Sequence, residues 1–119
     1  MDYKFQLCFQ IFNASYMINV IIYLRQNQNP KEMVNFLLQE KLIASASIDD
    51  NNISYKMVDD VVVEECYSVI TSQSKALLFD DIVAAVESRL GEKVAINSVP
   101  IVGANGFFND TIRKKTIAI

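Results

Sequence analysis

The sequence predicts an α+β fold, a ferredoxin-like βαββαβ sandwich in which an antiparallel sheet carries two helices on one face. Two helical stripes of apolar residues, in residues 30–41 and 75–90, are each flanked by β-rich segments. The chain has 119 residues, near the commonest size of a single domain, and 51% of them are hydrophobic, which argues against disorder. A short C-terminal helix and an optional extra N-terminal strand complete the predicted architecture.

The first predicted elements are two strands. Residues 5–12 alternate apolar and polar side chains, which is typical of a strand with one buried face. Residues 17–24 are β-branched and almost continuously apolar, as in a central strand. Met17 is an alternative start of the chain, so residues 1–16 are assigned to an N-terminal extension and residues 17–119 to a single domain.

The first predicted helix has a well-marked start. Asn29 suits the N-cap, Pro30 suits the first helical position, and Glu32 follows at the capping-box spacing. The apolar stripe then continues to about residue 41, and residues 42–48 follow as a strand. Asp and Asn in residues 49–52 predict a turn.

The next predicted unit is a long hairpin. Residues 53–58 and 61–70 read as its strands, and Asp59-Asp60 suits its tip. Ser72 and Ser74 are N-cap candidates for the helix at 75–90, which Gly91 ends.

The C-terminal part of the chain predicts one more strand and one more helix. Residues 94–101 form the strand, and Pro100 places it at an edge of the sheet or at a strand end. Residues 103–106 predict a turn, and residues 107–116 a terminal helix with Phe107, Phe108 and Ile112 facing inward.

Composition excludes several functional classes. The net charge of −3 argues against a nucleic-acid partner. The absence of His removes the commonest general base and metal ligand. The longest apolar run, residues 20–24, is far shorter than the roughly 20 residues of a membrane span, so we expect no membrane insertion. Cys8 and Cys66 form no CxxC pair, which predicts buried free thiols in a reducing compartment, the cytoplasm.

Four segments resemble the divalent-cation-tolerance (CutA-type) family of the PII-like superfamily. Residues 40–48, EKLIASASI, are similar to its Glu-(Lys/Arg)-Leu-Ala-Ala-Cys-Val-Asn-Ile stretch, and residues 65–72 to its strand ending in Lys-Thr. Residues 99–101 match its Leu-Pro-Val, and Phe108 with Ile112 falls where its C-terminal helix lies. The resemblance covers about residues 17–114.

This resemblance implies a non-catalytic homotrimer whose long hairpins extend sheets across subunits, with clefts at the subunit interfaces. The implied role is divalent metal-ion tolerance or response, or sensing of a small ligand or divalent cation. The family's Cys is replaced by Ser45, Thr71 stands at its Lys, and no His follows residues 99–101. We therefore assign no metal ligand, no cofactor and no catalytic residue.

The candidate cleft residues are Glu65, Tyr67, Tyr55 and Ser45. Strand parity places Glu65 on one face with Tyr67, where a carboxylate is able to bind a ligand or to pair across an interface. Tyr55 and Tyr67 line such a cleft or pack in the interface. Ser45 is a weak ligand or simply a small strand residue facing a helix.

Two alternative functions remain open at this stage. One is a PII-like signalling protein that binds a nucleotide and regulates a partner, although residues 103–106 lack a phosphate-binding glycine pattern. The other is an enzyme with a carboxylate and tyrosine site between subunits. The acidic pairs at 49–50, 59–60, 64–65 and 80–81 read as solvated turns or surfaces, since none has the spacing of a calcium loop.

Overall fold

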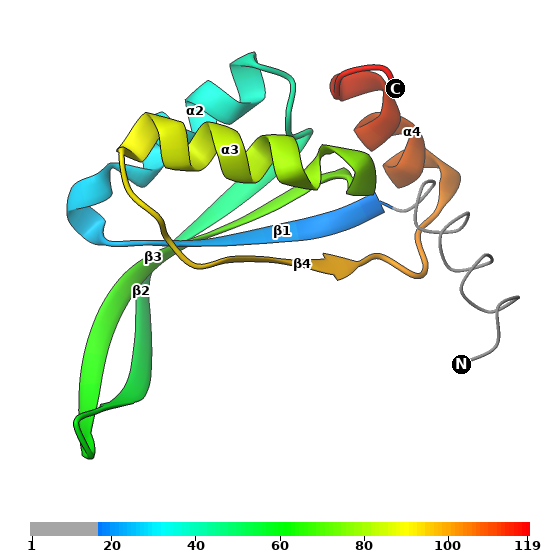
Figure 1. The fold of residues 1–119 in the computed structure, drawn as a ribbon. Helices are drawn as coiled ribbons and strands as arrows, with labels where there is room; N and C mark the ends of the chain where they lie inside the picture. The colour runs from blue at the N-terminus through cyan, green and yellow to red at the C-terminus, as the bar shows by residue number, and fades with distance from the viewer. Residues whose placement is uncertain (1–16) are drawn as a thin grey trace, which may run out of the picture.

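The computed structural model describes residues 17–119, which form a four-stranded antiparallel sheet with helices on one side (Figure 1). The sheet has the order β2-β3-β1-β4, with strands β1 (Met17–Leu24), β2 (Ser45–Val58), β3 (Val61–Lys75) and β4 (Ile96–Pro100). The helices are α2 (Pro30–Gln39), α3 (Phe79–Leu90) and α4 (Gly106–Lys115). The predicted α+β sandwich is confirmed, while the extra strand predicted within residues 1–16 lies outside the described residues.

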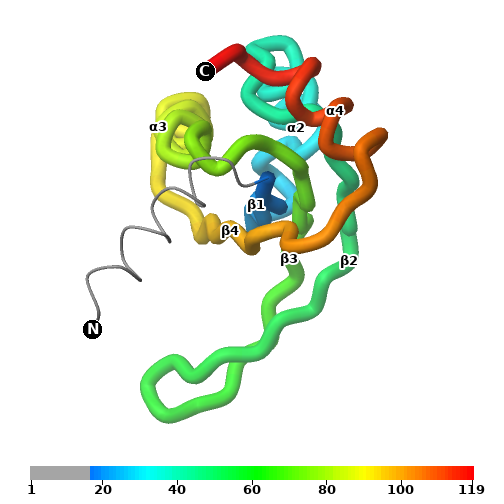
Figure 2. The backbone as a smooth tube through the Cα atoms, turned by 90° about the vertical axis from the view of Figure 1, so that its right-hand side faces the viewer, coloured from blue at the N-terminus to red at the C-terminus, as the bar shows by residue number. Residues whose placement is uncertain are grey.

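One face of the sheet forms the hydrophobic core with α2 and α3. Every second residue of β1 is buried, as strand alternation requires when helices cover one face. The core side chains come from both layers: Ile18, Val20, Ile22, Leu24 and Ile70 from the sheet, and Met33, Leu37, Ile82 and Val86 from the helices. Figure 2 shows the two helices together on this side of the sheet.

The start of α2 follows the sequence prediction. Asn29 is the N-cap and its side-chain oxygen accepts a hydrogen bond from the backbone N–H of Glu32. The φ angle of Asn29 is 52°, a left-handed conformation that Asn tolerates better than most residues. The Glu32 carboxylate does not turn back to the cap, because it pairs with Arg89 of α3 and ties the two helices together.

β2 differs from its prediction at both ends of residues 42–52. The strand begins at Ser45, because residues 42–44 form a buried loop. Residues 49–52 are not a turn: they continue the strand through an irregularity in which the register shifts between Asp49 and Asn52. The extra residue of such a bulge bends the strand and lets polar residues interrupt its pairing without ending it.

Ser72 and Ser74 are not helix caps, so this prediction was wrong. β3 continues to Lys75, and a 3-10 turn at residues 76–78 precedes α3. Both serines are buried on the helix-covered face, where the hydroxyl of Ser72 donates to the carbonyl of Val20 and that of Ser74 to the carbonyl of Leu42. A buried hydroxyl is tolerated in a core when it donates a hydrogen bond to a backbone carbonyl, which is why serine fits at these two positions.

The C-terminal helix packs against one end of the sheet. Asn105 caps α4 by accepting from the backbone N–H of Phe108, at 2.9 Å. Ile112 is buried as predicted, but Phe107 is 83% exposed and Phe108 37% exposed, so their predicted inward orientation was wrong. α4 has only one buried side chain along its length, which leaves its aromatic N-terminal turn on the surface.

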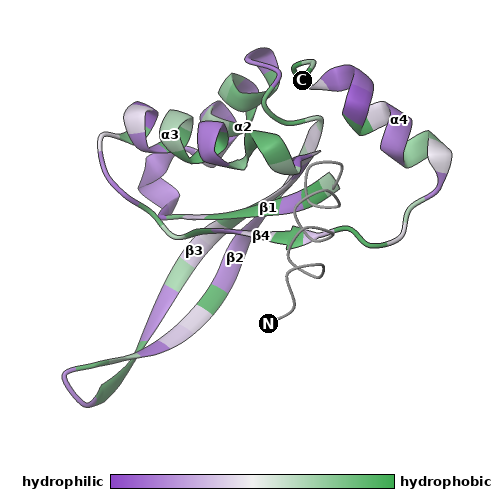
Figure 3. Cartoon of the chain, turned by 45° about the vertical axis from the view of Figure 1, so that its right-hand side comes forward, coloured by the Kyte–Doolittle hydropathy of each residue, from purple (hydrophilic) through white to green (hydrophobic). Residues whose placement is uncertain are grey.

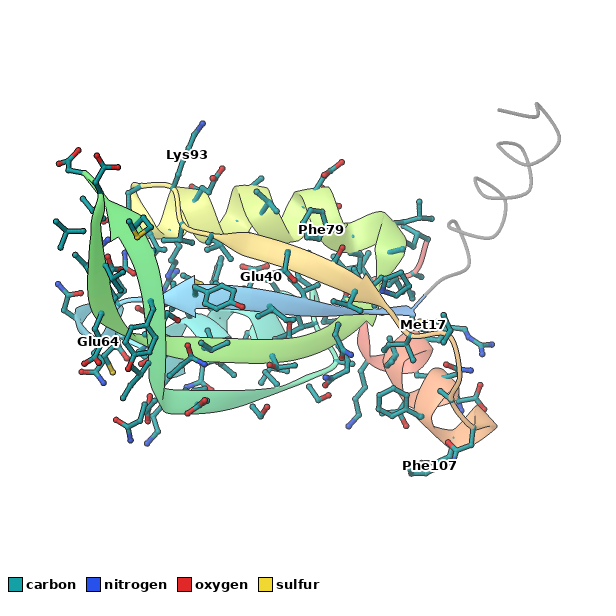
Figure 4. The ribbon with its side chains drawn as sticks, turned by 90° about the horizontal axis from the view of Figure 1, so that it is seen from below. Met17, Glu40, Glu64, Phe79, Lys93 and Phe107 are labelled. Atoms are coloured by element: carbon teal, nitrogen blue, oxygen red, sulfur yellow. The ribbon has the colours of Figure 1, made fainter. Side chains whose placement is uncertain are left out.

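The second face of the sheet carries no helix within residues 17–119 (Figure 4). Its central residues are mixed in polarity and half-buried, among them Asn19, Ile21, Tyr23, Thr71 and Gln73. None of the helices in the described part of the chain is long and apolar enough to cross a membrane.

Candidate functional site

The four predicted cleft residues lie at three separate places. Glu65 and Tyr67 are together on β3. Tyr55 pairs with Glu64 across the hairpin, so strand alternation places it on the opposite face from Glu65. Ser45 is at the far end of β2. The structure therefore reduces the candidate site to Glu65, Tyr67 and the residues that contact them.

The carboxylate of Glu65 is the centre of a cluster of three polar side chains. Its Oε1 lies 2.7 Å from Nζ of Lys56, and its Oε2 accepts a hydrogen bond from the hydroxyl of Tyr67. The Lys56 and Glu65 side chains are 54% and 35% exposed, so water and salt screen this ion pair. The cluster is thus a pre-arranged polar surface and not a buried core network.

The three groups of this cluster shift one another's pKa. The hydrogen bond from Lys56 lowers the pKa of Glu65, and the hydrogen bond to Glu65 raises the pKa of both Lys56 and Tyr67. Each shift strengthens the ordinary charge state at neutral pH: an ionised carboxylate, an ammonium and a protonated phenol. Proton-transfer catalysis needs the opposite, a pKa moved toward the working pH.

An aromatic contact anchors the cluster to the body of the domain. The rings of Tyr67 and Tyr23 meet edge to face, with their centroids 6.0 Å apart and their planes at 84°. Tyr23 belongs to β1, whose last pair with β3 is Leu24 with Ser68. Tyr67 therefore lies where the hairpin leaves the sheet, and Glu65 and Lys56 lie further out along the hairpin.

Lys56 was missed from the sequence, although a signal for it existed. With Asp59 and Asp60 at the tip, Val58 pairs with Val61, and Lys56 then lies diagonally opposite Glu65 on the same face. Diagonal neighbours of this kind are within reach of a long side chain. Both tip residues have positive φ, 49° and 65°, as a tight hairpin turn requires.

Ser45 does not face a helix, so this interpretation was wrong. It is exposed on the uncovered face of the sheet, where its hydroxyl donates to Oε1 of Gln73 at 2.5 Å. The amide of Gln73 in turn donates to Oδ1 of Asn19 at 2.9 Å. Ser45 thus ends a polar row that crosses three strands, far from Glu65.

The prediction of a buried thiol at Cys66 was also wrong, because this residue is exposed. Its Sγ accepts a hydrogen bond from Nε2 of Gln26 at 3.6 Å, at the edge of the hairpin. Within residues 17–119 no group of three or more His, Cys, Asp or Glu side chains is close enough together to hold a metal ion.

A hollow of about 580 Å³ lies at the N-terminal end of α2 and was not anticipated. Its lining combines the 3-10 turn before α2 with the bulged part of β2: Gln26, Asn27, Asn29, Pro30, Lys31, Ile48 and Asp50. The amide of Gln26 donates to the carbonyl of Asp50 at 2.8 Å and closes one side of it. The polar loop before Asn29 was the only sequence signal for this hollow.

Comparison with solved structures assigns the fold. The chain superposes on the divalent ion tolerance protein CutA1 from Ehrlichia chaffeensis with a TM-score of 0.77 and 19% identity, over 87% of this chain and 97% of that one. For CutA1 from Oryza sativa the TM-score is 0.78 and the identity 17%, over 88% of this chain and 97% of that one. For the divalent cation tolerance protein from Thermus thermophilus the TM-score is 0.77 and the identity 20%, over 84% of this chain and 98% of that one.

These likenesses confirm the predicted resemblance at the level of the fold. The chain has the CutA1 fold along nearly the whole length of the compared proteins. No family model and no curated protein sequence matches it. Identities of 17–20% show the fold alone, so the function has to be argued from the molecule itself.

Proposed function

We propose that this chain is a non-catalytic, CutA-type homotrimer that responds to divalent metal ions or to another small ligand. The observation that carries the proposal is the match of the fold, over 84–87% of this chain, to proteins described as divalent ion or divalent cation tolerance proteins. The hairpin matters most, because a single domain has no structural need for a ribbon that extends beyond its own sheet.

The absence of catalysis is supported by the chemistry of the candidate site. The sequence contains no His. The carboxylate with the most developed surroundings, Glu65, is held in its ordinary ionised state by Lys56 and Tyr67. A general acid or base needs a free partner with a pKa near the working pH, and this cluster offers none.

The trimer is supported by surfaces that a single copy leaves exposed. The hairpin carries large apolar side chains in water, and the second face of the sheet has no helix over it within residues 17–119. A two-stranded hairpin is at best marginally stable alone, so partner copies are the proposed cover.

One neighbour, from Archaeoglobus fulgidus, is described as periplasmic; for this chain we propose the cytoplasm.

The proposed ligand contact is the Lys56–Glu65–Tyr67 cluster, which we place in a cleft between subunits. Its one carboxylate suits a hard cation only if a neighbouring copy adds further oxygen ligands. Tight binding of Cu²⁺ or Zn²⁺ is not expected, because imidazole is absent from the chain and Ser45 stands at the position of the family's Cys.

The first test combines mass and binding. Light scattering after size exclusion should give about 40 kDa, three times the chain mass of 13.5 kDa, and a chelator should leave this mass unchanged. Calorimetry with Mg²⁺, Mn²⁺, Cu²⁺, Zn²⁺ and ATP then tests the ligand class, with Glu65→Gln as the matched variant. A monomer contradicts the trimer, and tight ATP binding favours the PII-like alternative.

A further inference from the structure

The sheet has an open edge at β4 within the described part of the chain. β4 is the outermost strand of the order β2-β3-β1-β4 and pairs there only with β1. The N–H of Ile101 donates to the carbonyl of Met17, which fixes the backbone groups that face β1. Because these groups alternate along an antiparallel pair, both backbone groups of Ile96 and Ser98 and the carbonyl of Pro100 point away from β1. A row of this kind is able to pair with a further strand.

A hollow of about 240 Å³ lies beside this edge, on the helix-covered side of the sheet. Its lining comes from β1, from β4 and from the start of α3: Ile18, Ala76, Phe79, Asp80, Ser98 and Pro100. Ser98 and Pro100 pair with the buried residues Val20 and Ile18, so they face the helix layer, yet both are exposed. The helices therefore leave β4 uncovered on this side, with room for another element.

Exposed apolar side chains flank the hollow. Leu77 follows Ala76 in the 3-10 turn before α3 and is 56% exposed. Val102 lies two residues beyond the end of β4 and is 88% exposed. Figure 3 shows the segment that follows β4 in green, the colour of hydrophobic residues. Covering apolar surface of this kind is favourable at about 25 cal/mol per Å².

The chain itself supplies a segment that fits this surface. Residues 1–16 lie outside the described residues and join β1 at Met17, which lies at the end of the sheet where β4 ends (Figure 4). Residues 5–12 alternate between two kinds of side chain, with Phe5, Leu7, Phe9 and Ile11 at one set of positions and Gln6, Cys8 and Gln10 between them. This alternation is typical of a strand with one buried face, which requires an apolar surface to pack on.

The connection to β1 has the length that this placement needs. Both sides of β1 are occupied, by β3 and by β4, so the nearest open edge is the outer side of β4. That position is two strand spacings from β1, about 10 Å. Residues 13–16 span about 13 Å when extended. A segment that turns back in this way runs antiparallel to β1 and hence parallel to β4.

We infer that residues 5–12 add to the sheet as a further strand beside β4, with their apolar side chains toward the hollow and Cys8 on the uncovered face. The partner of this open edge is thus a segment of the same chain. Backbone hydrogen bonds to Ile96 and Ser98 hold the added strand, and the start of α3 covers it. While it is docked, no strand of another chain is able to pair with this edge. The inference goes beyond the proposed trimer and its ligand and depends on neither.

The thiol of Cys8 allows a direct test in the full chain. Asn97 and Val99 lie on the uncovered face of β4, whereas Ser98, between them, faces the helix layer, and all three are exposed. Three variants are made, each with Cys66→Ser and with one of Asn97→Cys, Val99→Cys or Ser98→Cys. Each is treated at high dilution with dibromobimane, which becomes fluorescent when it bridges two nearby thiols.

We expect a bridge within one chain from Cys8 to the new thiol of Asn97→Cys or of Val99→Cys. The matched control Ser98→Cys should give at least tenfold less of this product. Equal bridging in all three variants overturns the inference, because an undocked segment reaches them alike. Absence of the product overturns it as well, and a bridge between two chains shows that the segment pairs with another copy instead. The mass of the assembly is measured separately, so a failed inference leaves the proposed trimer untouched.

Hydrogen exchange followed by NMR tests the same docking without a cross-linker. In the unsubstituted chain the amides of Ile96 and Ser98 should be protected, and Phe5→Asp/Phe9→Asp should speed their exchange at least tenfold. The amide of Asn97 faces β1 and should stay protected, which shows that the variant is folded. Gln6→Asp/Gln10→Asp adds the same charges at the intervening positions and should change neither rate. Equal rates at Ile96 and Ser98 in the unsubstituted chain and in the Phe variant contradict the inference.

Discussion

The body of the domain and the ribbon, in which residues 52–58 pair only with residues 61–67, use the same strands, β2 and β3, in opposite ways. In the body β3 lies between β2 and β1, helices cover one face of the sheet, and residues of β3 such as Ile70 and Ser72 are fully buried. In the ribbon the strands have neither, and Met57 and Val62 are more than half exposed. One pair of strands therefore changes from a core element to a surface element within a few residues.

The difference teaches where stability and function separate in this chain. Burial of apolar area stabilises a fold at about 25 cal/mol per Å², so the body supplies most of the folding free energy. The ribbon buries little and is free to serve as a contact surface. The Tyr23–Tyr67 ring contact lies at the boundary between the two regions, and the Lys56–Glu65 pair lies within the ribbon.

The largest expected effect distinguishes the two regions directly. Ile22→Ala removes a fully buried side chain at the centre of the sheet and should lower the free energy of unfolding by about 2–5 kcal/mol. Met57→Ala should change it by less than about 0.5 kcal/mol in a monomer, because the side chain is exposed. Urea unfolding of dilute chains measures both. Equal losses would contradict the separation of body and ribbon.

A second comparison uses two serines on opposite faces of the sheet. Ser74→Ala leaves the buried carbonyl of Leu42 without its 2.6 Å hydrogen bond and should cost about 1–3 kcal/mol. Ser45→Ala removes an exposed hydroxyl and should be nearly neutral for stability. Thermal unfolding of the two variants tests this, and a larger loss for Ser45→Ala would show that the uncovered face is the more tightly packed one.

A smaller effect is expected at the start of α2. Asn29→Ala loses the side-chain cap and puts at a φ of 52° a residue that tolerates this left-handed conformation less well than Asn, so a loss of about 1–2 kcal/mol is expected. Asn29→Gly also loses the cap but tolerates the left-handed φ, and should cost less. Urea denaturation of both variants separates the cap from the backbone strain, and a greater loss for Asn29→Gly would contradict this account.

The smallest effect concerns ionisation at the Lys56–Glu65–Tyr67 cluster. Glu65→Gln removes the carboxylate that raises the pKa of Tyr67, so the phenol should titrate at lower pH than in the unsubstituted chain. NMR titration of the tyrosine ring carbons follows it, with Glu64→Gln as the matched control on the other ribbon face. An unchanged Tyr67 pKa in Glu65→Gln would show that the hydrogen bond is absent in solution.

The pH dependence of stability follows from the same shifts. The pKa of Glu65 is lowered, so its contribution is present above its unfolded pKa and is lost as the pH falls through the folded pKa. The pKa of Lys56 is raised, so its contribution is present below its unfolded pKa and is lost as the pH rises through the folded pKa. Both pH windows lie away from neutral pH. Near neutral pH we therefore expect the contribution of the cluster to the free energy of unfolding to be constant.

The fold was predictable because it depends on local periodicity, whereas the site was not. The apolar stripe of α3 and the cap at Asn29 are repeated signals that several residues share. The caps predicted at Ser72 and Ser74 were wrong because a serine before a helical stripe is equally compatible with an N-cap and with a buried strand. Tyr55 was expected to share a cleft with Tyr67, but the two residues lie on opposite faces of the hairpin. The face of Tyr55 depends on the pairing register with β3, which the turn at residues 59–60 sets.

By itself, the sequence determined the element order, the core-facing positions of the helices and the sharp turn at the hairpin tip, since hydrophobic period and turn chemistry act over a few residues. Only the tertiary structure decided where β3 ends, that the ring of Tyr67 meets the ring of Tyr23 on β1, and that the hairpin tip and α4 lie at opposite ends of the molecule. The reason is physical: these features depend on the meeting of segments far apart in the chain, which no local pattern encodes.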